Sequence, residues 1–254
     1  MYQKLIIILL FVFTFLTLLF PSNAKANEGV QVTPGNFGLP GIIDLPTART
    51  FPDGELVITQ QLHKSLARSG VSFQALPNIG VSFRYTGHGI DGSEAYGRVN
   101  HDRSFDAQIL IVKESQYLPA ISLGLRDFIG TGWYSSEYIV GSKSIGNFEF
   151  TAGLGFGRLA GRNSFSNPLS NFAPSLSQRD NNKIGKGGTL GSINWFSGDT
   201  AAFYGVRYQL GENAILSAEY SPDLMLRENS YLEVKSPINF GGTYQFNKFF
   251  SLSG

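Results

Sequence analysis

The chain has 254 residues, only 15% of them charged, and its 20 basic and 19 acidic side chains nearly balance. This balance excludes the single-sign field that a nucleic-acid-binding protein presents. The chain has no cysteine, which excludes disulfides and a lipid-carrying N-terminal cysteine. Because soluble domains typically hold about 25% charged residues, this composition, with 21 phenylalanines and 30 glycines, favours a β-barrel with an apolar outer surface.

The first 26 residues have the pattern of a secretory signal peptide. Lys4 supplies a positive start, residues 5–20 are an unbroken run of apolar and threonine residues, and Ala24-Lys25-Ala26 offers a cleavage site. A membrane-anchoring helix is the alternative, but a run of about sixteen residues is short for spanning a bilayer. We therefore expect cleavage after Ala26 and a mature chain in the envelope of a Gram-negative bacterium.

Residues 27–54 are rich in glycine and proline and end in Asp53-Gly54, which predicts loops and turns. The region 55–254 then contains about twelve strand-like segments, several with clear period-two alternation. The predicted strands are residues 55–63, 69–76, 79–87, 93–100, 104–114, 118–128, 136–143, 147–159, 188–196, 200–210, 213–221 and 237–247.

The alternation is clearest in residues 147–157, where one face is apolar and the other is polar or glycine. The apolar face consists of Phe148, Phe150, Ala152, Leu154 and Phe156. Strands of about ten residues, at about 3.3 Å per residue and tilted by about 40°, cover the roughly 25 Å apolar band of an outer membrane. Short connections such as Pro77-Asn78 indicate hairpins. The pattern predicts an all-β fold: an antiparallel outer-membrane β-barrel with up-and-down meander topology.

Two features conflict with a complete barrel. Residues 249–254 read as the start of another strand, and an unpaired strand is untenable in lipid, so we expect a barrel that is incomplete at the C-terminus. With eight strands before it, the long polar segment 160–187 would lie on the periplasmic side, whereas such barrels keep long loops outside. Either the strand count is wrong by one, or this loop enters the lumen or meets a periplasmic partner.

Charged side chains on the polar strand faces form the candidate site. An Arg or Lys facing lipid near the midplane costs about 2–4 kcal/mol, so we assign these residues to the lumen. Unpaired, they offer hydrogen bonds to a hydroxyl-rich polymer; paired across the lumen, they simply fill it. The lumen-facing candidates are Arg84, Arg126, Glu149, Arg207 and Glu219.

Aromatic residues near the predicted strand ends are candidates for a membrane-interface girdle, with packing in a protein core as the alternative. They are Trp133, Tyr134, Tyr138, Trp195, Phe196 and Tyr204.

Signatures of catalysis or metal binding are missing from the sequence. The three histidines, His63, His88 and His101, lack HxH or HExxH spacing, so we expect no metal site and no cofactor. His101-Asp102-Arg103-Ser104 contains the residue types of a hydrolytic triad, but neighbours on a strand point to opposite faces and triads are built from distant segments. We interpret this segment as a polar turn and expect no enzymatic activity.

Three segments of the chain resemble the YjbH-type exopolysaccharide biosynthesis proteins. They are Gly38-Leu-Pro-Gly-Ile-Ile-Asp-Leu-Pro-Thr-Ala-Arg49 with Phe51-Pro-Asp-Gly-Glu-Leu56, Leu123-Gly-Leu-Arg-Asp-Phe-Ile-Gly-Thr-Gly-Trp-Tyr-Ser-Ser-Glu-Tyr138 with Gly141-Ser-Lys143, and Gly155-Phe-Gly-Arg-Leu-Ala-Gly-Arg-Asn-Ser-Phe-Ser-Asn-Pro-Leu169. The resemblance implies an outer-membrane β-barrel tied to export or assembly of extracellular polysaccharide, in a family whose members are much longer. It brings no catalytic residues with it.

The resemblance implies three kinds of partner: outer-membrane lipid, extracellular polysaccharide and other export proteins. The residues alone leave two other hypotheses open. One is an outer-membrane hydrolase acting on lipid or glycan. The other is a soluble periplasmic β-sandwich that binds glycan.

Overall fold

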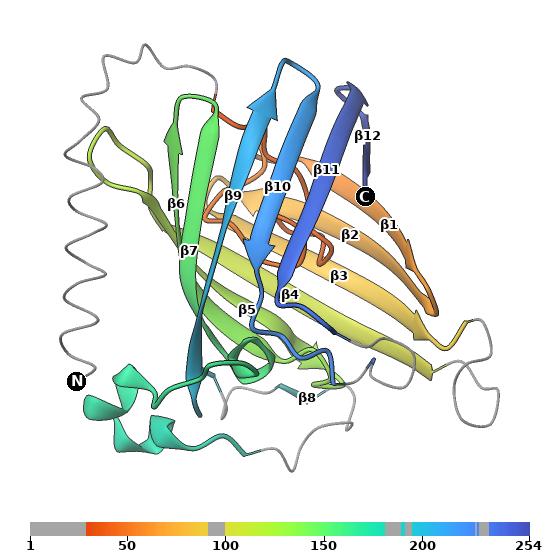
Figure 1. Ribbon diagram of the computed structural model, residues 1–254. Helices are drawn as coiled ribbons and strands as arrows, with labels where there is room; N and C mark the ends of the chain where they lie inside the picture. Colours follow the sequence, from red (N-terminus) through yellow and green to blue (C-terminus); the bar gives the residue numbers. More distant parts are fainter. Residues whose placement is uncertain (1–28, 91–99, 181–188, 191–194, 227, 229–233) are drawn as a thin grey trace.

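The computed structural model describes residues 29–90, 100–180, 189–190, 195–226, 228 and 234–254. Within these residues, twelve strands form one curved sheet (Figure 1). The strands are β1 (Leu56–His63), β2 (Leu66–Leu76), β3 (Ile79–His88), β4 (Asn100–Val112), β5 (Ala120–Gly130), β6 (Ser136–Ile145), β7 (Phe148–Phe156), β8 (Thr189–Leu190), β9 (Thr200–Leu210), β10 (Ala214–Tyr220), β11 (Ile238–Asn247) and β12 (Phe250–Ser253).

Helical structure in the described residues is limited to three single 3₁₀ turns after β7. They are η1 (Gly157–Ala160), η2 (Pro168–Asn171) and η3 (Pro174–Ser177). No helix in this part of the chain is both long and apolar enough to cross a membrane. The predicted signal peptide, residues 1–26, lies outside the described residues.

The sheet is an antiparallel meander, as predicted. Its order is β1-β2-β3-β4-β5-β6-β7-β9-β10-β11-β12, and β8 pairs separately with β5. The strands therefore belong to a single sheet, not to the two facing sheets of a sandwich. Within the described residues, β1 and β12 are unpaired edges, so the sheet does not close into the predicted barrel.

Two predicted strands fall largely outside the described residues. Of the predicted strand 188–196, residues 188 and 191–194 lie outside them, Thr189 and Leu190 form β8, and Trp195 and Phe196 lie in a turn. Of residues 93–100, only Asn100 lies among the described residues, as the first residue of β4. β3 pairs directly with β4, with His88 opposite Asn100, so seven strands precede the long loop in the described part of the chain, one fewer than predicted. This loop begins at the same end of the sheet as the β1–β2 turn.

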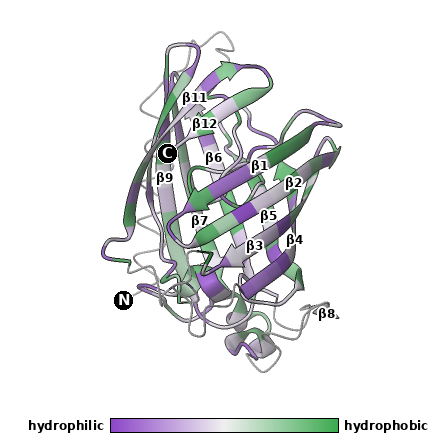
Figure 2. Ribbon diagram, turned by 90° about the vertical axis from the view of Figure 1, so that its right-hand side faces the viewer, coloured by the Kyte–Doolittle hydropathy of each residue, from purple (hydrophilic) through white to green (hydrophobic). Residues whose placement is uncertain are grey.

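Strand alternation gives the sheet two different faces (Figure 2). On the convex face, large apolar side chains are exposed on β1–β4, β7 and β9–β12; Phe148 on β7, for example, is 44% exposed. The outward apolar side chains of β5 and β6, such as Leu123 and Ile139, are half-buried. Other exposed members are Val71, Phe73, Val81, Phe83, Phe105, Ile109, Phe150, Tyr204, Leu216 and Tyr244. Phe156 departs from the prediction, because the ring of Phe196 packs edge-on against it at 5.5 Å and it is fully buried.

The concave face is packed against residues 29–54, the N-terminal segment, which occupies the place of the predicted lumen. Ile42, Leu45 and Ala48 of this segment form a core with Tyr138, Val140 and Phe203 of the sheet, among others. Glycines make room for this packing: a Cβ on Gly205 would lie 2.6 Å from Ile42 Cδ1, and one on Gly124 would overlap the ring of Tyr138. Burial of each large apolar side chain contributes about 1.5–3 kcal/mol, which explains why a segment without strands holds a defined path.

Candidate functional site on the concave face

The N-terminal segment has only isolated bridges, Pro34 to Pro40 and Gly41 to Pro46, in place of strands. Buried backbone groups must nevertheless find partners. Side chains of the sheet supply many of them. Gln74 accepts from the N–H of Phe51, and Ser142 accepts from the N–H of Ala48, while Gln108 donates to the carbonyl of Arg49.

Glu219 on β10 provides the most concentrated of these contacts. Its carboxylate accepts the backbone N–H groups of Ile43 and Asp44, each at 3.0 Å, and of Leu45 at 3.1 Å. Asn239 on β11 donates to the same carboxylate at 3.0 Å. Because one carboxylate accepts hydrogen bonds from three successive backbone N–H groups, Glu219 acts as a clamp on the turn at residues 43–45.

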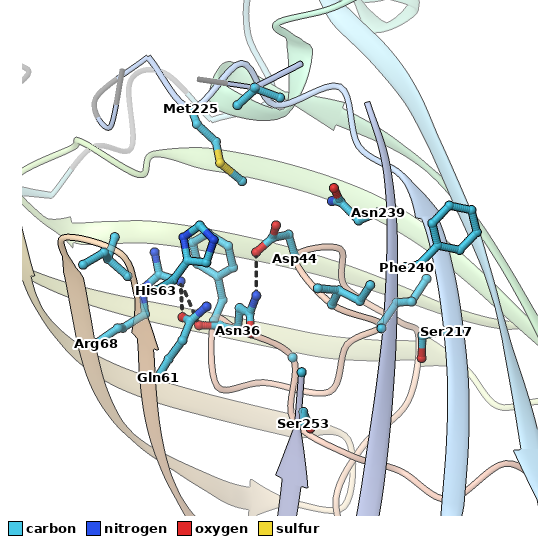
Figure 3. A pocket seen from close by; sticks show the side chains of 18 of the residues that line it. Asn36, Asp44, Gln61, His63, Arg68, Ser217, Met225, Asn239, Phe240 and Ser253 are labelled. Carbon is cyan, nitrogen blue, oxygen red and sulfur yellow. Dashed lines mark hydrogen bonds between the residues drawn. The ribbon is translucent and has the colours of Figure 1, made fainter. Parts of the chain in front are cut away.

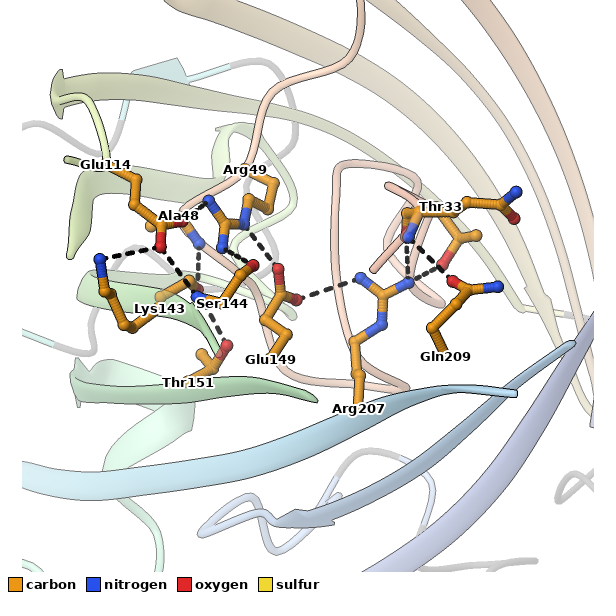
Figure 4. Close-up of polar contacts among 12 residues, drawn as sticks. Thr33, Ala48, Arg49, Glu114, Lys143, Ser144, Glu149, Thr151, Arg207 and Gln209 are labelled. Carbon is orange, nitrogen blue, oxygen red and sulfur yellow. Dashed lines mark hydrogen bonds and ion pairs between the residues drawn. The ribbon is translucent and has the colours of Figure 1, made fainter. Parts of the chain in front are cut away.

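Glu149 on β7 lies between two arginines (Figure 4). Its carboxylate pairs with Arg49 Nε at 2.6 Å and with Arg207 Nη1 at 3.2 Å. Arg207 also donates to the carbonyl of Gln31 at 2.6 Å and to Thr33 Oγ1 at 2.8 Å. This network therefore ties both ends of the N-terminal segment to β7 and β9.

Arg84 and Arg126 contact the middle of the N-terminal segment. Arg84 forms a bidentate pair with Asp106, at 2.8 and 2.9 Å, and Arg126 donates to the carbonyl of Asp44 at 2.8 Å. Both guanidinium groups lie over the ring of Phe37, with Cζ 4.7 and 4.0 Å from its centroid. The ring and the arginines together form a buried cation–π cluster.

Arg68 completes this cluster and was missed by the sequence analysis. Its Cζ lies 4.5 Å from the Phe37 centroid, and its Nη1 donates to the carbonyl of Asn36 and to Gln61 Oε1. The signal was present in the alternation of β2, which places Arg68 on the same face as the buried Ser72 and Gln74.

A second cluster forms beside Tyr134, in the connection between β5 and β6. Arg158 Nε pairs with Asp223 Oδ2 at 2.6 Å and its Nη2 with Glu228 Oε1 at 2.9 Å, while its Cζ lies 4.5 Å from the Tyr134 centroid. Burial raises the pKa of Tyr134 to about 12, so the phenol stays neutral. Burial alone would raise the pKa of Glu228, but the Arg158 guanidinium outweighs it and lowers that pKa.

All five sequence-predicted lumen residues lie buried on the concave face. The structure brings Glu149 and Arg207 together and places Arg84 and Arg126 on one ring, whereas Glu219 binds a different turn. Each is paired or hydrogen-bonded within the protein. The geometry therefore agrees with the interpretation in which these charges fill the interior.

The aromatic residues divide between two locations. Tyr134 and Tyr138 are buried in the interior, which contradicts their assignment to a girdle. Tyr204 is exposed on the convex face, where it stacks on Tyr220 with centroids 4.8 Å apart.

The proposed polar turn around His101 is part of β4 instead. His101 is exposed and stacks on Tyr85 at 5.2 Å, whereas Asp102 and Ser104 are buried on the other face. The sheet therefore separates these triad residue types. Among the described residues, no group of three or more His, Cys, Asp or Glu side chains is arranged to hold a metal ion.

A cavity of about 580 Å³ lies between β1 and β11–β12, where the sheet is open (Figure 3). The N-terminal segment forms its inner wall through Asn36 and Asp44, whose side chains are hydrogen-bonded at 2.9 Å. Gln61 and Arg68 line the β1–β2 side, and Asn239 and Phe240 line the β11 side. The cavity thus faces both edges of the sheet.

These features define a class of protein: a single antiparallel meander with an apolar outer face and a charged inner face filled by its own N-terminal segment. The comparisons with known proteins identify the family. The model of the family described as exopolysaccharide biosynthesis protein YbjH matches residues 33–254, and the chain belongs to this YjbH family.

The chain is similar to the uncharacterized lipoprotein YjbH of Escherichia coli (strain K12), with 31% identity over 221 residues. The match covers 83% of this chain and 31% of the relative, so the chain spans about a third of that relative's length. No solved structure matches the chain.

Proposed function

We propose that the chain forms part of an outer-membrane β-barrel that supports the export or assembly of extracellular polysaccharide without catalysing a reaction itself. The observation that carries the membrane part is the exposed apolar face of the sheet. The polysaccharide part rests on membership of a family described by exopolysaccharide biosynthesis.

The convex face supports a lipid environment for a simple physical reason. Soluble monomers rarely expose contiguous apolar patches larger than a few hundred Å², yet here exposed large apolar side chains cover β1–β4 on one side of the sheet and β7 with β9–β12 on the other. The outward apolar side chains of β5 and β6, between these two parts, are half-buried. Charged side chains such as Arg84 and Arg207 are turned to the concave face and paired there, whereas Arg103, near the end of β4, is exposed on the convex face. In a bilayer this division removes the cost of exposing the apolar residues to water.

The two ends of the sheet also support the proposal. The connections at one end have at most seven residues and include the tight turns Pro77-Asn78, Gly146-Asn147 and 211–213, whereas the three longest connections, residues 89–99, 157–199 and 221–237, all lie at the other end. Outer-membrane barrels have this asymmetry, with short periplasmic turns and longer extracellular loops. The name of the relative, a lipoprotein, supports a cell-envelope location.

The packed interior limits the role that the sheet can have. The N-terminal segment occupies the concave face, so it blocks that face to a polysaccharide chain. The proposal is therefore a scaffold or assembly role for this part of the barrel, with transport through its interior requiring the segment to move.

Site-directed spin labelling tests the membrane part, and the absence of native cysteine makes the labels specific. Labels at Phe148→Cys and Phe150→Cys in lipid vesicles should collide frequently with oxygen and rarely with an aqueous nickel complex. A label at Asn147→Cys, in the adjacent turn, is the matched control and should meet nickel. Nickel access at 148 and 150 equal to that at 147 would refute the lipid-facing assignment.

A gene deletion in the source bacterium tests the polysaccharide part. We expect reduced extracellular polysaccharide, restored by the wild-type gene. Unchanged polysaccharide in the deletion strain would remove this part of the proposal while leaving the membrane location intact.

A further inference from the structure

The direction of the two edge strands restricts how the sheet can close. Ten pairings connect β1 to β12 in sequence, and all are antiparallel. Because each pairing reverses direction, an even number leaves β12 pointing the same way as β1. Direct pairing of these edges would be parallel, whereas bacterial single-chain barrels are antiparallel with an even number of strands. An antiparallel closure therefore requires an odd number of additional strands.

The edges of the sheet are more exposed than its middle. Ile58 on β1 is 76% exposed and Phe240 on β11 is 80% exposed, whereas Phe83, on the same face of the interior strand β3, is 37% exposed. β12 pairs with residues 243–247 of β11, and backbone bonds between Gly242 and Gly254 extend this pairing by one step. Among the described residues, no strand covers the outer side of residues 238–241.

The cavity between these edges has the chemistry of a strand-binding site. Its lining contains outward-facing apolar side chains, Leu62, Ile238 and Phe240, and inward-facing polar side chains from the neighbouring positions, Gln61 and Asn239. A ligand that satisfies both must be apolar on one side and polar on the other with a period of two residues. An amphipathic β-strand has this pattern, and its backbone would also satisfy the free N–H and C=O groups of the edges.

We infer that the gap between β1 and β12 is the docking site for an odd number of amphipathic β-strands from the same YjbH-family polypeptide. The chain spans 31% of its E. coli relative, so chains of this family hold ample sequence for such strands. A second copy of the chain does not fit this gap. Two copies inserted in the same orientation in a membrane would place β12 of one copy parallel to β1 of the other, whereas closure requires antiparallel neighbours. The inference rests on the proposed function for its membrane setting but not for the strand directions.

Photo-crosslinking from the β1 edge tests the inference. The photoreactive residue p-benzoylphenylalanine replaces Ile58, or in a second variant Leu62, in protein produced from its natural gene in the envelope. We expect crosslinks within one polypeptide, mapped by mass spectrometry to a segment of alternating apolar and polar residues that is neither β2 nor β12. The same residue at Phe83, on β3 between two paired strands, is the control and should crosslink only to its neighbours β2 and β4.

Three outcomes would overturn the inference. Crosslinks from position 58 or 62 to Phe250 or Leu252 would show that the sheet closes on itself. Crosslinks to a different protein would show that the strands come from a partner, and crosslinks to lipid alone would show that the edge stays open. Membrane fractionation of the same samples separates this inference from the proposed function. The expected crosslinks in protein found outside the outer membrane would refute the proposed function but would still support the strand-docking site.

Discussion

The carboxylate of Glu219 accepts a hydrogen bond from the backbone N–H of Leu45 at 3.1 Å, although the two residues are 174 positions apart in the chain. The contact joins the N-terminal segment to a strand near the other end of the sheet. Because Glu149, Arg126 and Gln74 bind other parts of the same segment, the segment reaches its final path only when β2 to β10 are in place. The interior is therefore a product of the whole sheet.

Replacement of Glu219 by Gln should loosen the N-terminal segment. The amide keeps one acceptor oxygen and loses the charge, which leaves at least one buried N–H among residues 43–45 without a full partner, at a cost of about 2 kcal/mol or more. Hydrogen exchange measured by mass spectrometry should show faster exchange in residues 29–54. Glu212→Gln, in an exposed turn, is the matched control, and equal exchange in both variants would contradict the clamp.

Replacement of Phe37 by Ala should destabilise the protein strongly. The ring contacts Arg68, Arg84 and Arg126 and packs edge-on against Tyr134 at 5.8 Å, and truncation of a buried Phe costs about 3–5 kcal/mol. Denaturant unfolding in detergent should show this loss. Phe172→Ala, at an exposed position in the loop, should change the free energy of unfolding by less than about 0.5 kcal/mol.

Removal of the charge at Glu149 should lower the free energy of unfolding more than removal of the charge at Glu114. In Glu149→Gln the buried Arg207 faces an amide and has no other acidic partner in the described residues. Breaking a buried ion pair lowers the free energy of unfolding by about 3–5 kcal/mol. Glu114 pairs with Arg49 and Lys143 but is partly exposed. Because solvent weakens these ion pairs, losing them should lower the free energy of unfolding less. Unfolding of the two single variants tests this order, and equal effects would contradict the central role of Glu149.

The pair Arg158–Glu228 should make stability dependent on acid pH. Burial acts to raise the pKa of Glu228, but Arg158 lowers it below the ordinary value of 4.5. A carboxylate with a lowered folded pKa stabilises the fold fully above its unfolded pKa and loses this contribution as the pH falls through the folded value. The difference in unfolding free energy between wild type and Glu228→Gln should be constant above about pH 5.5 and shrink below pH 4.5. If this difference in unfolding free energy grew on acidification, the lowered pKa of Glu228 in the folded protein would be contradicted.

The strand alternation predicted the sheet because each strand has one face against protein and one face exposed, so side-chain type follows position directly. It placed Arg84, Glu149 and Glu219 on the inner face for the same reason. Their partners could not be predicted, because Asp106, Arg49 and the N–H groups of residues 43–45 depend on register and on the path of a segment without periodicity. Glycines on the inner face leave space beside the backbone, and only the structure shows that Ile42 and Tyr138 occupy it.

A charge on the convex face should separate the membrane proposal from a soluble alternative. Phe83 lies in the middle of β3 with its ring 5.0 Å from that of Phe105, on the exposed face. In a bilayer, Phe83→Arg should cost about 2–4 kcal/mol near the midplane, whereas Phe83→Leu should cost far less. Measured as folding in lipid vesicles, the Arg variant should insert poorly. If both variants fold equally well in lipid, or if the Arg variant folds in buffer without detergent, the face does not contact hydrocarbon, because a guanidinium is costly only where water is excluded.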